Sequence, residues 1–224
     1  MRVLKFGGSS LADFACLEQV AVLAKAQLKD EMLLVLSAPG GMTDSLVALA
    51  SAAEQGQDFN LLWDALVTRC NALKTAVEEK QGAVQNWPDF DELKNKLDGV
   101  ALIKCCPDKI RAFIISFGER VSVSLMQSLL ADQNAHYLQA TDCIVSTGGY
   151  IDAEADLAAS KVRFQAVLKE SPATVYIMPG FTASNDKGEL TTLGRNGSDY
   201  SAAIAAACLE AQVCQIWTDV DGVY

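Results

Sequence analysis

The 224-residue sequence is poor in the residues that most metal and nucleophile sites need. It has one histidine, His136, and no Cys-x-x-Cys pair, so no zinc site has a complete set of neighbouring ligands. The seven cysteines are odd in number and scattered, and several stand among apolar residues. Because no base lies near any of them in sequence, we expect reduced, mostly buried thiols of a cytosolic protein.

The sequence also lacks an excess of basic residues and a long apolar run. Its 18 Lys and Arg against 28 Asp and Glu give a net charge of −10 and a pI near 4.6. Such a balance argues against nucleic acid and anionic membranes as partners. No run of about 20 apolar residues is present to span a bilayer, and the first residues lack the apolar stretch of a signal peptide. We therefore expect a cytoplasmic protein.

Short apolar runs alternate with helical stretches along the whole sequence, and half of the residues are hydrophobic. The expected strands lie at 2–6, 32–37, 136–139, 143–147, 174–178 and 213–218. The expected helices lie near 11–28, 43–55, 60–80, 89–104, 107–132, 155–169 and 198–210. This alternation predicts a three-layer αβα sandwich on a mainly parallel sheet. Residues 1–224 then form one domain with a helical insertion at about 56–104, and a β-hairpin turns at 185–188.

Glycine-containing turns follow the first two expected strands. Residues 7–10 read Gly-Gly-Ser-Ser, and residues 37–43 read Ser-Ala-Pro-Gly-Gly-Met-Thr. Glycines let backbone N–H groups close on phosphate oxygens, and Lys5 at the first strand's end can reach the same oxygens. Neither turn matches a P-loop or a dinucleotide fingerprint, so an ordinary tight turn stays an alternative.

The most informative segment is residues 193–203, Leu-Gly-Arg-Asn-Gly-Ser-Asp-Tyr-Ser-Ala-Ala. Glycines followed by Ser, Asp and a small apolar run are typical of a loop that becomes a helix N-terminus, which can hold an anion. Arg195 adds a planar fork that pairs with a carboxylate or phosphate. A plain capped helix with a surface arginine is the alternative.

Four segments together resemble the aspartokinases, a branch of the amino-acid kinase family. They are residues 5–10 (Lys-Phe-Gly-Gly-Ser-Ser), 117–120 (Phe-Gly-Glu-Arg), 194–199 (Gly-Arg-Asn-Gly-Ser-Asp) and 218–224 (Thr-Asp-Val-Asp-Gly-Val-Tyr). The first and third are the most specific, and the last is shared with uridylate and glutamate 5-kinases. The resemblance runs from Arg2 to Tyr224 with a variable patch at 56–104, and it is greatest to the bifunctional aspartokinase/homoserine dehydrogenases.

The resemblance implies the amino-acid kinase fold and transfer of the γ-phosphoryl group of MgATP to the β-carboxylate of L-aspartate. The product, 4-phospho-L-aspartate, begins the lysine, threonine and methionine branch. A carboxylate nucleophile is already ionised at neutral pH, so no general base is needed. Positioning and charge neutralisation then supply most of the catalysis.

The resemblance also implies roles for individual residues. Lys5 would contact the transferring phosphoryl group, Glu119 would accept the α-ammonium of aspartate, and Arg195 would hold its α-carboxylate. Further substrate contacts are expected at Thr43, Ser198 and Asp199, where a simple N-cap is the alternative for Asp199. The nucleotide side is expected to comprise Gly7, Gly8, Ser9, Ser37, Thr218, Asp219 and Tyr224, with no metal ligand from the protein and Mg²⁺ arriving with ATP.

Two other functions stay open on the sequence. Another amino-acid kinase, acting on glutamate, N-acetylglutamate or uridylate, would share much of the pattern, although only a zwitterionic amino acid needs both Glu119 and Arg195. The second alternative function is that of a catalytically inactive fragment that only binds ligand. In the family a further nucleotide segment and regulatory ACT domains follow the last strand, so we expect a C-terminally truncated catalytic domain, weakly active or inactive alone, from a homo-oligomeric parent.

Overall fold

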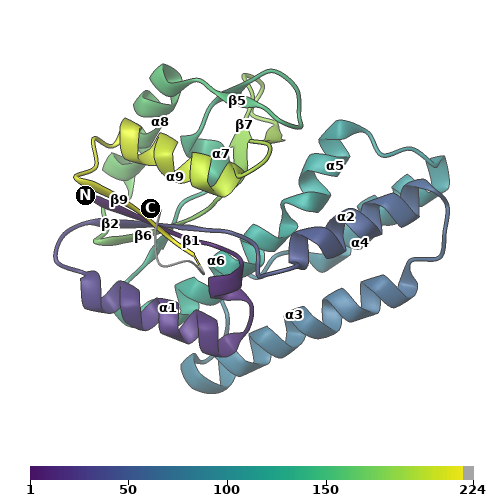
Figure 1. The fold of residues 1–224 in the computed structure, drawn as a ribbon, viewed down its shortest axis with the longest axis horizontal. Coiled ribbons are helices and arrows are strands. Elements are labelled where there is room, and N and C mark those ends of the chain that lie inside the picture. Colours follow the sequence, from purple (N-terminus) through teal and green to yellow (C-terminus); the bar gives the residue numbers. More distant parts are fainter. Residues whose placement is uncertain (219–224) are drawn as a thin grey trace.

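The computed structural model describes residues 1–218, and their core is a five-stranded parallel sheet (Figure 1). Its strand order is β3-β6-β2-β1-β9. The strands are β1 (Arg2–Phe6), β2 (Met32–Leu36), β3 (His136–Tyr137), β6 (Val175–Pro179) and β9 (Val213–Trp217). All residues of β2 and β6 are buried. Their continuous apolar runs are those of strands covered on both faces.

Helices cover both faces of this sheet. Leu4, Phe6 and Leu34 pack with α1 (Phe14–Gln27) and α6 (Phe117–Leu129) in one apolar cluster. Val3, Leu33 and the other alternate strand residues pack with α7 (Ala140–Cys143), α8 (Leu157–Glu170) and α9 (Gly197–Cys208) in a second cluster. Because successive strand residues point to opposite faces, two clusters result. The predicted three-layer αβα sandwich is confirmed.

Four helices extend beside the sheet (Figure 1). They are α2 (Met42–Glu54), α3 (Asn60–Gln81), α4 (Phe90–Ile103) and α5 (Asp108–Ile115). Residues 56–104, expected to be helical, contain α3 and α4. Buried residues of α3, such as Leu66 and Cys70, belong to the same cluster as α1 and α6, so this segment is packed against the helices that cover one face of the sheet. Among the described residues, no helix combines the length and the apolar character that a membrane crossing requires.

Two antiparallel pairs complete the fold. The expected hairpin around residues 185–188 is formed by β7 (Thr182–Ser184) and β8 (Leu190–Thr192). The other pair is β4 (Ser146–Thr147) with β5 (Glu154–Ala155). Short 3₁₀ turns, η1 (Ser9–Leu11) and η2 (Ala131–Gln133), stand after β1 and α6.

The single helix predicted over 107–132 is wrong, because α5 and α6 are separate helices that meet at Ser116. The Ser116 hydroxyl donates to the carbonyl oxygens of Ala112 and Phe113, at 2.7 and 3.3 Å. A buried serine that bonds back to the preceding turn bends a helix.

Two other expected boundaries also differ from the structure. The strand predicted over 143–147 is only partly right: Cys143 ends α7, Val145 forms a single parallel bridge with Ser184, and Ser146–Thr147 pairs with β5, all outside the main sheet. Ile144 and Val145 are apolar because they pack in the interior, which periodicity alone does not distinguish from sheet pairing. The first helix begins at Phe14 rather than Leu11, because the Asp13 carboxylate accepts the N–H of Cys16 at 2.9 Å and caps it.

Candidate functional site

A cleft of about 560 Å³ opens where β1 and β2 end. The carboxyl ends of parallel strands are where open α/β sheets bind ligands. Eight of the residues singled out from the sequence line this cleft: Lys5, Gly8, Ser37, Thr43, Glu119, Arg195, Ser198 and Asp199. They come from segments spread along the sequence, from Lys5 near its start to Asp199 near its end.

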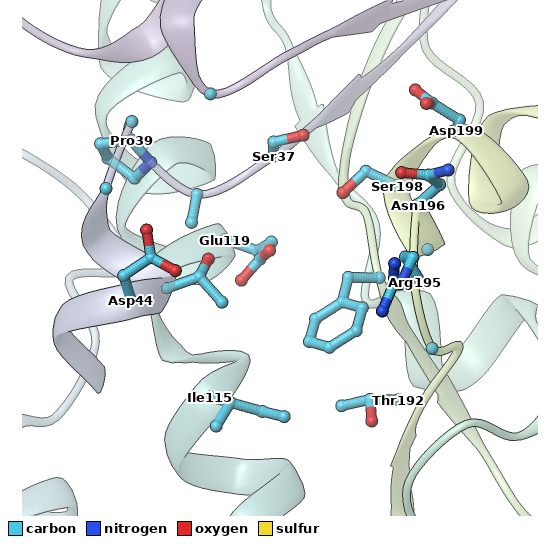
Figure 2. Close-up of a pocket in the computed structure, with 18 of the residues that line it drawn as sticks. Ser37, Pro39, Asp44, Ile115, Glu119, Thr192, Arg195, Asn196, Ser198 and Asp199 are labelled. Carbon is cyan, nitrogen blue, oxygen red and sulfur yellow. The ribbon is translucent and has the colours of Figure 1, made fainter. Parts of the chain in front are cut away.

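The cleft has two walls of opposite chemical character (Figure 2). Asp44 of α2 and Glu119 of α6 place carboxylates on one wall. Arg195, Asn196 and Ser198 form the opposite wall, from the loop before α9 and its first turn, together with Asp199, whose carboxylate is paired with Lys5. A ligand that lies between them would meet acceptors for a cation on one side and donors for an anion on the other.

Lys5 is buried, with 7% of its surface exposed, and its ammonium forms an ion pair with Asp199. The Lys5 Nζ lies 2.6 Å from Asp199 Oδ1. A charge at this depth needs a partner of opposite sign. Asp199 stands within the first turn of α9, and the helix begins at Gly197 with Asn196 before it, so Asp199 is not the N-cap. The structure therefore makes Asp199 the partner that fixes Lys5.

Glu119 is the most unusual group in the cleft. Its side chain is 3% exposed, and no protein group of the described chain bonds its Oε2 atom. Burial raises the pKa of Glu119 to about 8, although N–H groups of Ala38 and of Glu119 itself oppose the shift. A buried carboxylate without a cation is costly, so a ligand ammonium would be a favourable partner.

Gly118 lets Glu119 reach this position. A Cβ on Gly118 would lie 2.6 Å from the Cβ of Ala38, which is too close for any side chain. The absence of a side chain allows α6 to approach the loop after β2, and the next residue then faces the cleft. The Phe-Gly-Glu order of residues 117–119 thus has a steric reason.

The loop before α9 turns sharply around Arg195. Gly194 and Asn196 both have left-handed backbones, with φ of 68° and 58°. The left-handed φ favours glycine at residue 194, and a Cβ there would also lie 2.6 Å from Asp152 Oδ1, so the Asp152 side chain would have to move. Arg195 is exposed on the cleft wall, and no carboxylate of residues 1–218 forms an ion pair with it. Its guanidinium fork is available to a ligand anion.

Phe181 is a cleft residue that the sequence analysis missed. It has a left-handed φ of 66°, and its N–H donates to Ser201 Oγ at 2.9 Å. A Cβ on Gly180 would lie 2.7 Å from the Cβ of Ser198, so the loop is pressed against α9. The Pro-Gly-Phe-Thr stretch at the end of β6 was the signal that could have identified it. Other lining residues missed are Asp44, Ile115, Ile151, Asp152 and Asn196.

The glycine turn after β1 differs in part from its expected role. The N–H of Gly7 donates to the carbonyl of Trp217 at 3.1 Å, so it joins β1 to the end of β9 and is occupied. Gly8 lines the cleft, whereas Gly7 and Ser9 do not, and Ser9 is exposed. Within this turn the structure thus leaves Gly8 as the best candidate for contact with a phosphate.

Thr218 is the last described residue, and it lies near Lys5. A Cβ on Gly7 would lie 3.6 Å from Lys5 Nζ and 3.9 Å from Thr218 Oγ1, so both side chains approach the same point. Asp219 and Tyr224, expected on the nucleotide side, lie outside the described residues. No group of three or more His, Cys, Asp and Glu within residues 1–218 is placed to hold a metal ion.

Comparisons with known proteins identify the family and the fold. The model of the amino acid kinase family matches residues 1–224. The chain is 37% identical to the bifunctional aspartokinase/homoserine dehydrogenase of Buchnera aphidicola and 38% identical to that of Haemophilus influenzae. Each match covers 100% of this chain and 29% of the relative. The crystal structure of Escherichia coli aspartokinase III in complex with aspartate and ADP has a TM-score of 0.83 and 30% identity, over 100% of this chain and 50% of that one.

Proposed function

Since this chain belongs to the amino acid kinase family, we propose that it forms the aspartate-binding part of an aspartate kinase. The proposed reaction transfers the γ-phosphoryl group of ATP to the β-carboxylate of L-aspartate and yields 4-phospho-L-aspartate and ADP. It is the first step of the branch that leads to lysine, threonine and methionine. The chain spans less than a third of the bifunctional relatives, so this is a proposal for the longer protein.

The observation that carries the proposal is the buried Glu119 carboxylate, across the cleft from the Arg195 guanidinium (Figure 2). Within residues 1–218, no group bonds the Oε2 atom of Glu119 and no carboxylate forms an ion pair with Arg195. An α-amino acid has an ammonium and a carboxylate on one carbon, which matches these two walls. Its ammonium would supply the partner that Glu119 lacks, and its α-carboxylate would form a bidentate ion pair with the Arg195 guanidinium. Ser198 and the N-terminus of α9 would support the same carboxylate.

The side-chain carboxylate of the bound amino acid would then point toward Lys5. Because this nucleophile is ionised at neutral pH, the site needs no general base. It needs positive charge where the β-carboxylate of aspartate approaches the negatively charged triphosphate of ATP, and Lys5 supplies that charge. The pairing with Asp199 would keep the ammonium in place before ATP arrives.

The nucleotide would approach from the side of Gly8, Ser37 and Thr218, with Mg²⁺ entering as the counter-ion of its phosphates. The complex of aspartokinase III with aspartate and ADP supports nucleotide use by this fold. We further propose that the longer protein is cytoplasmic and homo-oligomeric.

The alternatives make different demands on the cleft. N-acetylglutamate and uridylate carry no ammonium, so neither would supply a partner for Glu119. Glutamate has the ammonium but is one methylene longer. With its α-ammonium bound to Glu119 and its α-carboxylate bound to Arg195, its side-chain carboxylate would extend past Lys5. An inactive fragment would bind aspartate without turnover.

An assay that follows ADP formation tests the proposal. The longer protein that carries this chain, and the 224-residue chain itself, would receive MgATP with aspartate, glutamate, N-acetylglutamate or uridylate. We expect turnover with aspartate by the longer protein and weak or no turnover by the short chain. Preferential turnover of any of the other three acceptors would contradict the proposal.

A further inference from the structure

Arg69, in the middle of α3, makes an unusual pair of contacts. It is half-buried, and its Nη2 donates to the carbonyl oxygen of Gly40 at 2.7 Å and to that of Ala12 at 3.1 Å. The first acceptor lies in the loop between β2 and α2, and the second lies just after the glycine turn that follows β1. One nitrogen of the helical segment 56–104 therefore holds two loops that are distant in sequence.

The two loops also contact each other at the cleft. The N–H of Gly40 donates to Gly8 at 2.9 Å, and the N–H of Ser37 donates to Phe6 at 3.1 Å. A Cβ on Gly40 would lie 3.1 Å from the oxygen of Gly8, so the backbones are as close as glycine permits. Gly8 and Gly40 line the cleft, whereas Arg69 does not. Arg69 thus contacts this pair of loops from the side that faces away from the cleft.

Peptide geometry links the Gly40 contact to the cleft. In a trans peptide the carbonyl and the following N–H point in opposite directions. With the Gly40 oxygen directed to Arg69, the Gly41 N–H is directed away from α3. No acceptor within residues 1–218 pairs with that N–H, and Gly41 itself lines the cleft. The bond from Arg69 to the Gly40 oxygen therefore fixes the direction of the Gly41 N–H.

We propose that Arg69 is a positioning residue that sets the two glycine loops for phosphoryl transfer, and that the helical segment 56–104 serves the site through it. The proposal rests on the proposed kinase function for its kinetic consequence only. Removal of the guanidinium would free the Gly40–Gly41 peptide to rotate and Gly8 to move. Glu119 belongs to α6 and Arg195 to the loop before α9, so neither side chain stands on the two loops that Arg69 contacts.

The test compares Arg69→Met, Arg69→Lys and a matched control, Arg163→Met, in the longer protein that carries this chain. Arg163 is also half-buried and also makes two hydrogen bonds, to Thr141 O at 3.2 Å and Ser184 Oγ at 3.0 Å, but it does not line the cleft. Both methionine variants lose a similar amount of support. Only Arg69 touches the glycine loops.

The first readout is backbone hydrogen exchange, which is independent of any activity. We expect Arg69→Met to exchange faster in peptides that cover residues 7–13 and 37–42, and Arg163→Met to leave those peptides unchanged. Arg69→Lys should restore much of the protection, because an ammonium can also donate to two carbonyls. Unchanged exchange at both loops in Arg69→Met, or equal loosening in Arg163→Met, would overturn the proposal.

The second readout is the split between kcat and KM. Loss of two charge-assisted hydrogen bonds behind the phosphate side should lower kcat about tenfold or more, with the KM for aspartate changed less than about threefold. If Arg69→Met does not fold, Arg69→Lys carries the test, with a smaller fall in kcat expected. A wild-type protein without kinase activity would refute the proposed function, while the exchange result would still decide the role of Arg69.

Discussion

Binding of aspartate should release a proton from Glu119, and the pH dependence of its affinity should disappear in Glu119→Gln. Burial raises the pKa of Glu119 to about 8, so the carboxyl is mostly protonated in the free protein at neutral pH. Pairing with a ligand ammonium requires the ionised form. Affinity should therefore rise with pH up to the pKa and level off above it.

The magnitude follows from two opposing free energies. A hydrogen-bonded ion pair in a dry site contributes about 3 kcal/mol. Ionising Glu119 against its pKa costs about 0.4 kcal/mol at pH 8, about 1.4 at pH 7 and about 2.7 at pH 6. Wild type should thus bind aspartate about 80-fold more tightly than Glu119→Gln at pH 8, about 15-fold at pH 7 and nearly equally at pH 6.

Isothermal titration of aspartate at these three pH values measures the affinity ratio directly. Titration at pH 7 in buffers of different ionisation enthalpy measures the proton count, for which we expect release of about 0.9 proton by wild type and none by Glu119→Gln. Arg195→Ala, which weakens binding from the other wall, is the control and should keep the proton release. A flat affinity profile in wild type, or proton release that persists in Glu119→Gln, would refute the assignment of Glu119 to the ammonium.

Arg195→Ala should raise the KM for aspartate about 30-fold, or about 2 kcal/mol, with little change for ATP, and Arg195→Lys should also be impaired; equal effects on both substrates in steady-state kinetics would contradict this. Lys5→Met should lower kcat at least about a hundredfold with its circular dichroism melt retained, and a fall under about tenfold would exclude Lys5 as the phosphoryl contact. Because the folded pKa of Glu119 exceeds its unfolded value of 4.5, the folded state binds more protons between these values. The free energy of unfolding should therefore fall from about pH 5 to pH 8 by up to about 1.4 kcal/mol per unit, and denaturant titrations of Glu119→Gln should lack that component.

The local pattern of apolar residues and glycines in the sequence was enough to predict most strands of the sheet and the positions of the glycine turns. The buried runs at residues 2–6 and 32–36 have few alternatives to a covered parallel strand, and the turns that follow them must then meet at one edge of the sheet. The break at Ser116 could not be foreseen, because residues 107–132 keep a helical apolar spacing across it. The bond from Ser116 to the Ala112 carbonyl and the close approach of Gly118 to Ala38 accompany the bend, and both become visible only in the structure.

The contacts between residues of the site that are distant in sequence could not be predicted without the structure. Lys5 and Asp199 are far apart in sequence, and nothing local indicates that one neutralises the other. The Gly7 N–H was expected on a phosphate, but it serves a strand that arrives more than 200 residues later. Arg69 has backbone carbonyls as partners, and carbonyls leave no signature in a sequence.

A crystal structure of the longer protein with L-aspartate bound would show how the substrate is oriented in the cleft. We predict that the α-ammonium lies within hydrogen-bond distance of Glu119, that the α-carboxylate contacts Arg195, and that the β-carboxylate points toward Lys5. Aspartate bound in the reverse orientation, or bound outside the cleft with Glu119 still unpaired, would contradict this prediction.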